Sequence, residues 1–244
     1  MRRDLYQVGQ LAILEMKEYL RDRLSLVWAI LFPIGFLFAG KEWWFPEGVR
    51  GFVIPTTITY LTMATGLFFF GMGVTNARSR GVLKTYRASP LQPWKYIAAQ
   101  TLDRTLIVFL VTILVLLLGR VVYGESLAGN PVAFSGVILL STATMLALGF
   151  ALLAFIKGVE AVGGAATILF MLGFMTTGII YLGDLPSILS TVMRHLPFHP
   201  ISQCVAIIWM GFPVDEIFWR HLAILGGWLV GLSLIANRWF RWDI

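Results

Sequence analysis

Long uncharged segments alternate with short charged ones along the chain. Six segments contain no Asp, Glu, Lys or Arg: residues 24–40, 51–77, 105–119, 126–156, 161–183 and 221–237. A bilayer core about 30 Å thick is crossed by roughly 20 apolar helical residues. The third segment is short, but charged side chains at its ends can reach the interface. The pattern predicts six spans, at residues 24–40, 51–77, 102–123, 131–155, 161–182 and 217–240.

A seventh uncharged region, residues 195–214, differs because prolines interrupt it. Pro197, Pro200 and Pro213 each prevent continuous helical hydrogen bonding. We therefore expect residues 185–213 to form a broken, re-entrant pair of short helices on the external side, before the last span.

The residues before the first span follow a helical amphipathic pattern. Apolar side chains recur at helical spacing, at Leu5, Val8, Ala12, Met16 and Tyr19, and charged residues occupy the other faces. Such a pattern predicts an interfacial helix over residues 1–23 that lies on the membrane. The predicted fold class is all-α integral membrane, with one transmembrane domain over residues 1–244.

The composition agrees with this reading. Hydrophobic residues make up 58% of the chain and charged residues 13%, against about 45–50% and about 25% in ordinary soluble domains. The single cysteine, Cys204, rules out an internal disulfide and a cysteine-rich zinc site.

Basic residues are distributed unequally between the two sides of the predicted bundle. One side holds 14 of the 19, namely Arg2, Arg3, Lys17, Arg21, Arg23, Arg78, Arg80, Lys84, Arg87, Lys95, Arg104, Lys157, Arg238 and Arg241. The positive-inside rule then places both termini in the cytoplasm. We attribute the formal charge of +6 to basic side chains that contact lipid headgroups, and it is no argument for binding of nucleic acid.

Motifs for catalysis and metal binding are weak. Residues 35–41 match G-x-x-x-x-G-K, but Glu42 stands where a nucleotide-binding loop needs Ser or Thr. His195 and His199 have metal-ligand spacing, but Pro197 lies between them. No nucleophile and base can be paired. We therefore expect no catalytic residue, no metal site and no cofactor bound by this chain.

The connection between the second and third predicted spans carries the most informative pattern. As a helix over residues 80–88 it places Arg80, Lys84 and Arg87 on one face, and Leu83 and Tyr86 on a neighbouring face. The pair Ser89-Pro90 ends this helix. Such a helix suits docking on a protein partner, and an anionic-lipid-binding loop is the alternative.

This segment resembles the cytoplasmic signature of the membrane subunits of type-2 ABC exporters. The signature spans residues 80–91 and reads Arg-Gly-Val-Leu-Lys-Thr-Tyr-Arg-Ala-Ser-Pro-Leu. The resemblance extends along the whole chain, through the amphipathic N-terminal helix, the six spans and the proline-broken segment at residues 196–200.

The resemblance implies a permease in the bacterial cytoplasmic membrane that forms a homodimer and binds two ATPase subunits. Residues 80–89 would be the coupling helix, with Arg80, Leu83, Lys84, Tyr86 and Arg87 contacting the ATPase. ATP and Mg would be bound by that partner subunit, and this chain would be a transport subunit and not an enzyme.

The resemblance also implies that the first, second and fifth spans line the substrate path. The lining residues expected on that basis are Phe32, Phe36, Thr59, Tyr60, Thr62, Thr176 and Thr177. Each Thr could instead bond its own helix backbone. The spans lack an intramembrane charge cluster, which favours an amphiphilic substrate such as a lipid-linked glycan, a drug or antibiotic, or a lipid. An ion-coupled secondary transporter and an integral-membrane enzyme are the alternative functions.

Overall fold

The computed structural model describes residues 2–21, 23–40, 47–79, 81, 93–156, 158–177 and 187–239. Most of these residues are helical, and none of them forms a strand. The elements are α1 (Arg2–Arg21), α2 (Arg23–Ala39), η2 (Glu47–Phe52), α3 (Val53–Ala64), η3 (Thr65–Phe70), α4 (Gly71–Ser79), α6 (Pro93–Tyr123), α7 (Pro131–Phe155), α8 (Val159–Thr176), α9 (Ser187–His195), α10 (Phe198–Met210) and α11 (Glu216–Trp239).

Among the described residues, five helical segments are long and apolar enough to cross a membrane. They are Arg50–Ser79, Lys95–Tyr123, Pro131–Phe155, Val159–Thr176 and Glu216–Trp239. Ala29–Ala39, which is part of α2, and Phe198–Met210, which is the whole of α10, are shorter apolar helices. The prediction of an all-helical, multi-pass membrane protein is confirmed, and the full layout of six spans stays a prediction.

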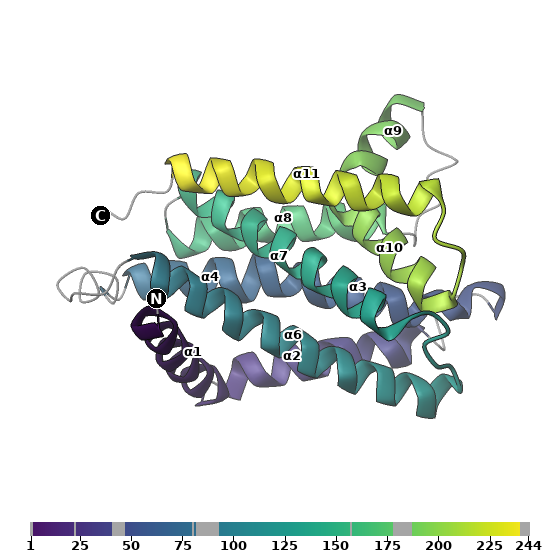
Figure 1. Ribbon diagram of the computed structural model, residues 1–244, viewed down its shortest axis with the longest axis horizontal. Coiled ribbons are helices and arrows are strands. Elements are labelled where there is room, and N and C mark those ends of the chain that lie inside the picture. Colours follow the sequence, from purple (N-terminus) through teal and green to yellow (C-terminus); the bar gives the residue numbers. More distant parts are fainter. Residues whose placement is uncertain are drawn as a thin grey trace.

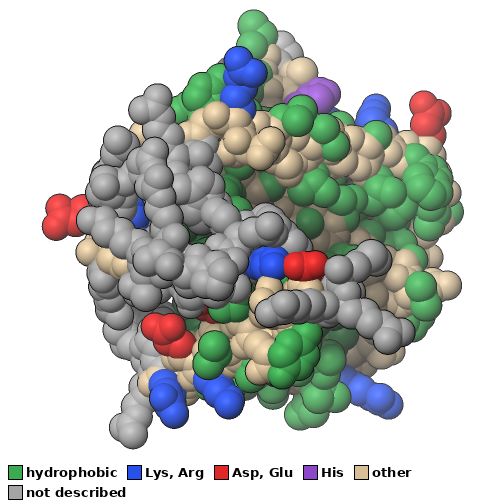
Figure 2. All heavy atoms as spheres, turned by 60° about the vertical axis from the view of Figure 1, so that its left-hand side comes forward, with side chains coloured by type: hydrophobic (Ala, Val, Ile, Leu, Met, Phe, Trp, Pro, Cys, Tyr) green, Lys and Arg blue, Asp and Glu red, His purple; other side chains and the backbone are tan. Residues whose placement is uncertain are grey.

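The long helices lie side by side as a bundle with two distinct ends (Figure 1). At one end, on the left of Figure 1, α1 begins, α4 ends, α6 begins and α11 ends; we call it the α1 end. At the other, the α10 end, the connection from α6 to α7 lies near α10 and the start of α11. On the face that Figure 2 shows, hydrophobic side chains are spread over the described surface, and most charged side chains lie near its margin.

The second apolar segment is the central element of the bundle. All twelve residues of α3 are buried, and contacts reach it from α2, α6, α7, α8 and α10. The helix continues as η3, a π-helical stretch over Thr65–Phe70, before returning to α-helix in α4. A π-helix has about one more residue per turn than an α-helix, which widens the backbone there, and such stretches are frequent at functional sites.

Two glycines let α7 approach this π-helical stretch closely. A Cβ atom added at Gly149 would lie 2.1 Å from the carbonyl oxygen of Gly66, and one at Gly66 would lie 2.3 Å from that of Met145. No side chain fits at either position without moving a backbone. The small residues therefore set the distance between these helices.

The third apolar helix begins earlier than the sequence predicts. The predicted span starts at residue 102, but α6 starts at Pro93, so that Asp103 and Arg104 lie inside the helix. We expected both side chains to lie at a span end, where they would be solvated or reach the interface. The expectation of solvated side chains is wrong, because Asp103 is 1% exposed and Arg104 is 7% exposed, and the start of the span in the membrane stays a prediction.

The segment before the last span is a broken helix pair, as its prolines predict. Helix α9 ends at His195, and α10 begins at Phe198 directly after Pro197. Gly211 ends α10 in a left-handed conformation, with φ of 69°. Whether this pair is re-entrant in a membrane stays a prediction.

Candidate functional site

The predicted coupling residues, Arg80, Leu83, Lys84, Tyr86 and Arg87, lie outside the described residues. The structure describes the two helices that flank them. Helix α4 ends at Ser79, and the N–H of Gly81 donates to the carbonyl of Arg78 at 3.1 Å in a turn with φ of 75° at Gly81. Helix α6 then starts at Pro93. The predicted coupling segment thus connects directly to two long helices.

Several of the predicted lining residues meet around Tyr60 of α3. The ring of Phe36 in α2 contacts the Tyr60 ring edge to face, with centroids 4.9 Å apart. The ring of Phe174 in α8 stacks on Tyr60 at 5.0 Å. Phe170 lies between Tyr60 and Phe32, about equally far from each at 6.0 Å. The structure therefore joins the first, second and fifth predicted spans through one aromatic cluster.

The Tyr60 hydroxyl ties the same cluster to the end of α8. Thr177 Oγ1 donates to Tyr60 Oη at 2.9 Å, and Tyr60 Oη donates to the carbonyl of Phe174 at 3.3 Å. These groups are buried, where an unpaired hydroxyl would be costly. The hydrogen bonds fix the orientation of the Tyr60 ring against α8.

Side chains of α10 bond the last carbonyl groups of α8. His199 Nδ1 lies 3.1 Å from the carbonyl oxygen of Thr176, and Ser202 Oγ donates to that of Thr177 at 3.1 Å. Carbonyls in the last turn of a helix have no partner within the helix. Helices α3 and α10 therefore supply the cap that the sequence of α8 lacks.

The predicted lining threonines form hydrogen bonds with their own helices. Thr59 donates to the carbonyl of Pro55 at 2.9 Å, Thr62 to Thr59 at 2.7 Å and Thr176 to Gly173 at 2.9 Å. All three side chains are fully buried. In this conformation their hydroxyl groups face helix backbone.

A cavity of about 400 Å³ lies between α2, the α3–η3 segment and α8. Its wall is almost entirely apolar and consists of Ala29, Phe32, Pro33, Leu61, Ala64, Phe68, Phe69, Thr167, Phe170 and Met171. Of the seven residues predicted to line the path, Phe32 lies on this wall. Phe36 and Tyr60 pack behind the wall, against Phe32 and Phe170.

Irregular helix turns border the cavity on two sides. Pro33 lies inside α2 and has no N–H for the carbonyl of Ala29, four residues earlier. On the other side Phe68 and Phe69 belong to the π-helical stretch η3. Kinks in helices concentrate at such positions, so the helices that border the cavity are the ones best able to bend.

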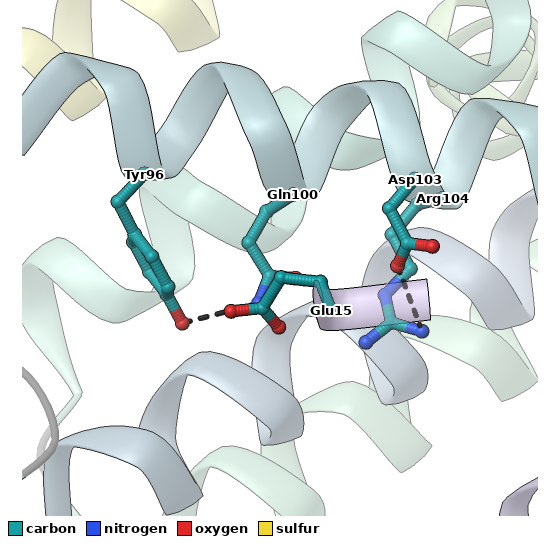
Figure 3. Close-up of polar contacts among 5 residues, drawn as sticks. All are labelled: Glu15, Tyr96, Gln100, Asp103 and Arg104. Atoms are coloured by element: carbon teal, nitrogen blue, oxygen red, sulfur yellow. Dashed lines mark hydrogen bonds and ion pairs between the residues drawn. The ribbon is translucent and has the colours of Figure 1, made fainter. Parts of the chain in front are cut away.

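A second polar site joins α1 to α6 at the α1 end (Figure 3). Tyr96, Gln100, Asp103 and Arg104 all come from α6, and Glu15 of α1 lies beside the Gln100 amide. Gln100 Nε2 donates to Glu15 Oε2 at 2.6 Å and lies 3.1 Å from Tyr96 Oη. Burial raises the pKa of Glu15 to about 7, with the nearby carboxylates of Glu18 and Asp103 raising it further and Arg104 lowering it.

Charged groups continue this contact on both sides of Glu15. Arg104 Nη1 lies 3.6 Å from Asp103 Oδ2, and its guanidinium lies 4.7 Å from the centre of the Tyr19 ring. Nearer the start of α1, Lys95 Nζ contacts Asp4 Oδ1 at 2.6 Å and donates to Gln7 Oε1 at 2.7 Å. The Lys95 ammonium lowers the pKa of Asp4 to about 2. We call the contact of Asp4, Gln7, Glu15 and Tyr19 with Lys95, Gln100 and Arg104 the α1–α6 polar contact.

Sequence reasoning missed Phe170 and Glu15. Phe170 lies seven residues before Thr177, so a helical projection would have placed it on the same face as that predicted lining residue. Glu15 was assigned to the exposed side of α1. Glu15 is partly buried and accepts from Gln100, which is 85 residues away in sequence, so no local pattern indicates the contact.

The two histidines with metal-ligand spacing face different partners. His195 Nδ1 contacts the carbonyl of Thr191 at 2.8 Å, whereas the ring of His199 packs against that of His221 with centroids 5.6 Å apart. Within the part of the chain that the structure describes, no group of three or more His, Cys, Asp and Glu side chains could hold a metal ion.

Comparison with known proteins identifies a family over most of the chain. The sequence model described as "ABC-2 family transporter protein" matches residues 46–237. A protein of Bacillus subtilis (strain 168) named "Putative transport permease YvfS" is 23% identical, over 94% of this chain and 95% of its own length.

Proposed function

The chain belongs to the ABC-2 family of transporter proteins, and from this premise we propose that it moves an amphiphilic substrate across the membrane as the permease of an ATP-driven exporter. The family assigns the chain a transport role in the membrane and leaves ATP hydrolysis to a separate subunit. The direction of transport, the class of substrate, the coupling contacts and the assembly are proposals that go beyond the family.

The apolar cavity is the observation that supports an amphiphilic substrate. It lies between helices that also form the Tyr60 aromatic cluster, and only Thr167 among its lining residues carries a polar side chain. A strongly charged solute would lose its hydration there without gaining a partner. A lipid-linked glycan, an apolar drug or antibiotic, or a lipid fits this wall through its apolar part.

Coupling to ATP is proposed to act through residues 80–89. A segment connected directly to α4 and α6 transmits a displacement of the ATPase to the bundle as a rigid-body movement. We expect Leu83 and Tyr86 to bind an apolar cleft of that subunit, and Arg80, Lys84 and Arg87 to pair with its acidic groups.

The proposed assembly is a homodimer in the bacterial cytoplasmic membrane. Its six spans per chain are the five long apolar segments together with α2. Both termini lie in the cytoplasm, and the α9–α10 pair is re-entrant from the external side. Bending at Pro33 and at η3 changes the access to the cavity during transport.

The experiment that tests the substrate path fills the cavity. Thr167→Trp places a large side chain on its wall, and Leu110→Trp places the same side chain on the exposed face of α6, where Leu110 is 56% exposed. Both variants are purified with the partner ATPase and reconstituted in vesicles, and substrate-stimulated ATP hydrolysis is measured with a panel of amphiphiles.

We expect Thr167→Trp to lose substrate stimulation at least tenfold while its basal ATP hydrolysis is kept, and Leu110→Trp to behave as the unmodified protein. Equal stimulation of both variants would show that the cavity is not on the substrate path.

A further inference from the structure

A groove that is separate from the substrate cavity lies at the α1 end of the bundle. Its volume is about 300 Å³. Helices α6, α7 and α11 supply most of its wall, which consists of Phe70, Ile97, Thr101, Ala143, Leu146, Ala147, Phe150, Leu229, Ser233, Ala236 and Asn237. None of these residues belongs to the Tyr60 cluster or to the substrate cavity.

Regular helix spacing explains why a groove forms here. Ile97 and Thr101 share one face of α6, Ala143 and Ala147 share one face of α7, and Leu229, Ser233 and Asn237 share one face of α11. The two alanines are small, so α7 does not fill the space between its neighbours. The deepest side chains, Phe70 and Leu146, are 1% and 4% exposed.

Along α11 the groove wall becomes more polar toward the α1 end. Leu229 is apolar, whereas Ser233 and Asn237 lie exposed toward the end of the helix. Arg238 follows at once, and its guanidinium lies 5.6 Å from the centre of the Trp239 ring. Trp and Arg side chains together are typical of the level of lipid headgroups.

The length of the groove matches one leaflet of a bilayer. Asn237 follows Leu229 by eight positions, which is about 12 Å along a helix. Half of a bilayer core is about 15 Å thick. A transmembrane helix is about 10–12 Å wide with its side chains, so a groove of this volume takes a hydrocarbon chain and not another helix.

We propose that this groove binds one acyl chain of an anionic phospholipid, with the lipid phosphate near Asn237 and Arg238. The occupant follows from the surroundings, because α6, α7 and α11 all contain segments apolar enough to cross the membrane. No carboxylate lies among the groove residues, and Arg238 supplies the positive charge. The proposal requires only that the chain spans a membrane, so it stands or falls separately from the substrate path.

The test compares two neighbouring substitutions on α11. Ser233→Trp fills the groove from its exposed edge, and Leu234→Trp adds the same bulk one residue later, at a 64% exposed position outside the groove. The proteins are reconstituted in nanodiscs of equal parts phosphatidylglycerol and phosphatidylcholine and extracted in mild detergent. Native mass spectrometry then counts the lipids that each chain retains.

We expect the unmodified chain and Leu234→Trp to retain one phosphatidylglycerol, and Ser233→Trp to retain at least fivefold less. Arg238→Gln should keep a bound lipid but lose the preference for phosphatidylglycerol over phosphatidylcholine. Equal retention by Ser233→Trp and Leu234→Trp would overturn the proposed site, and an unchanged preference in Arg238→Gln would overturn the role of its charge.

Photolabelling of the unmodified chain tests the groove without the risk that a substituted chain fails to fold. Phosphatidylglycerol with a photoreactive diazirine on its acyl chain is incorporated in vesicles, and labelled residues are mapped after irradiation. We expect labelling at Thr101 and Ser233 to exceed labelling at Leu110 and Leu117, which lie on the exposed face of α6 at 56% and 60% exposure. Equal labelling of the four positions would overturn the proposal, because the groove would then contact lipid no differently from the rest of the lipid-facing surface.

Discussion

Glu15 lies on the side of α1 that packs against α6, where the Gln100 amide donates to it at 2.6 Å. Its pKa of about 7 is well above the usual value of 4.5 because burial disfavours the charged form. Contact with α6 therefore favours the protonated acid. As the pH rises from about 4.5 to about 7, α1 loses this contribution to its contact with α6, because only the seated form still holds the proton in that range.

We expect Glu15→Gln to remove this pH dependence, because a glutamine oxygen still accepts from Gln100 and carries no charge. Spin labels at Tyr6 in α1 and Leu102 in α6, which are 68% and 53% exposed, report the distance between the helices. In the unmodified chain the distance distribution should broaden as the pH rises from about 5 to about 7, and in Glu15→Gln it should not. Identical behaviour of the two proteins would assign any change to another group.

Gly149 is the position where the close approach of α7 to η3 is easiest to test. A Cβ atom there would lie 2.1 Å from the Gly66 carbonyl oxygen, whereas one at Gly136 of the same helix would have nothing within 4 Å. Gly149→Ala should cost about 1–3 kcal/mol of stability, the usual range for an overpacked core. Gly136→Ala should cost nothing measurable or stabilise the helix slightly. Thermal unfolding in detergent, followed by tryptophan fluorescence, distinguishes the two.

At the level of elements, helices with uniform apolar composition were predicted well. Helix α7 has the bounds expected from the sequence, because Asn130 caps its first turn by accepting from the N–H groups of Val132 and Ala133 at 2.8 Å and 3.3 Å. The start of α6 was missed for a physical reason. Lys95 and Gln100 are polar residues that α1 covers, and counting apolar residues cannot recognise a helix whose polar side chains find partners elsewhere.

The predicted coupling helix gives the prediction at this scale. Leu83→Asp or Tyr86→Asp should leave membrane insertion intact but release the ATPase subunit, because docking would strip a carboxylate of water without offering it a partner. Val132→Asp introduces the same charge at an 81% exposed position at the start of α7 and serves as the control. The readout is the amount of ATPase subunit that co-purifies with the tagged chain, and undiminished co-purification of both variants would disprove the assignment of the coupling helix.

At the scale of the whole molecule, the sequence predicted a helical membrane protein and its family but not its internal cavities. Spans were predictable because hydrocarbon solvent imposes a long uncharged stretch on each one. The cavity walls were not, because Phe32, Ala64 and Phe170 come together only through the packing of three separate helices. The predicted threonines show the same limit. Local periodicity could not decide whether each hydroxyl lines the substrate path or donates to a carbonyl of its own helix.

The exposed face of α8 gives the prediction about assembly. Ile168, Met171 and Met175 are 71%, 54% and 46% exposed and recur at helical spacing. If α8 faces a second copy of the chain, Ile168→Cys in a Cys204→Ala background should form disulfide-linked dimers in native membranes under mild oxidation. Leu110→Cys in the same background should stay monomeric. Crosslinking of both variants to the same extent would indicate random collision.

The α1–α6 polar contact also sets an order of events during synthesis. Gln100 follows Glu15 by 85 residues, so at roughly 5–20 residues per second the ribosome adds the partner about 4–17 s after the acid itself. Until then Glu15 is hydrated and ionised, and α1 has no partner helix to cover it. The first helix to be translated therefore waits for its main partner until α2 and the α3–α4 segment have also been translated.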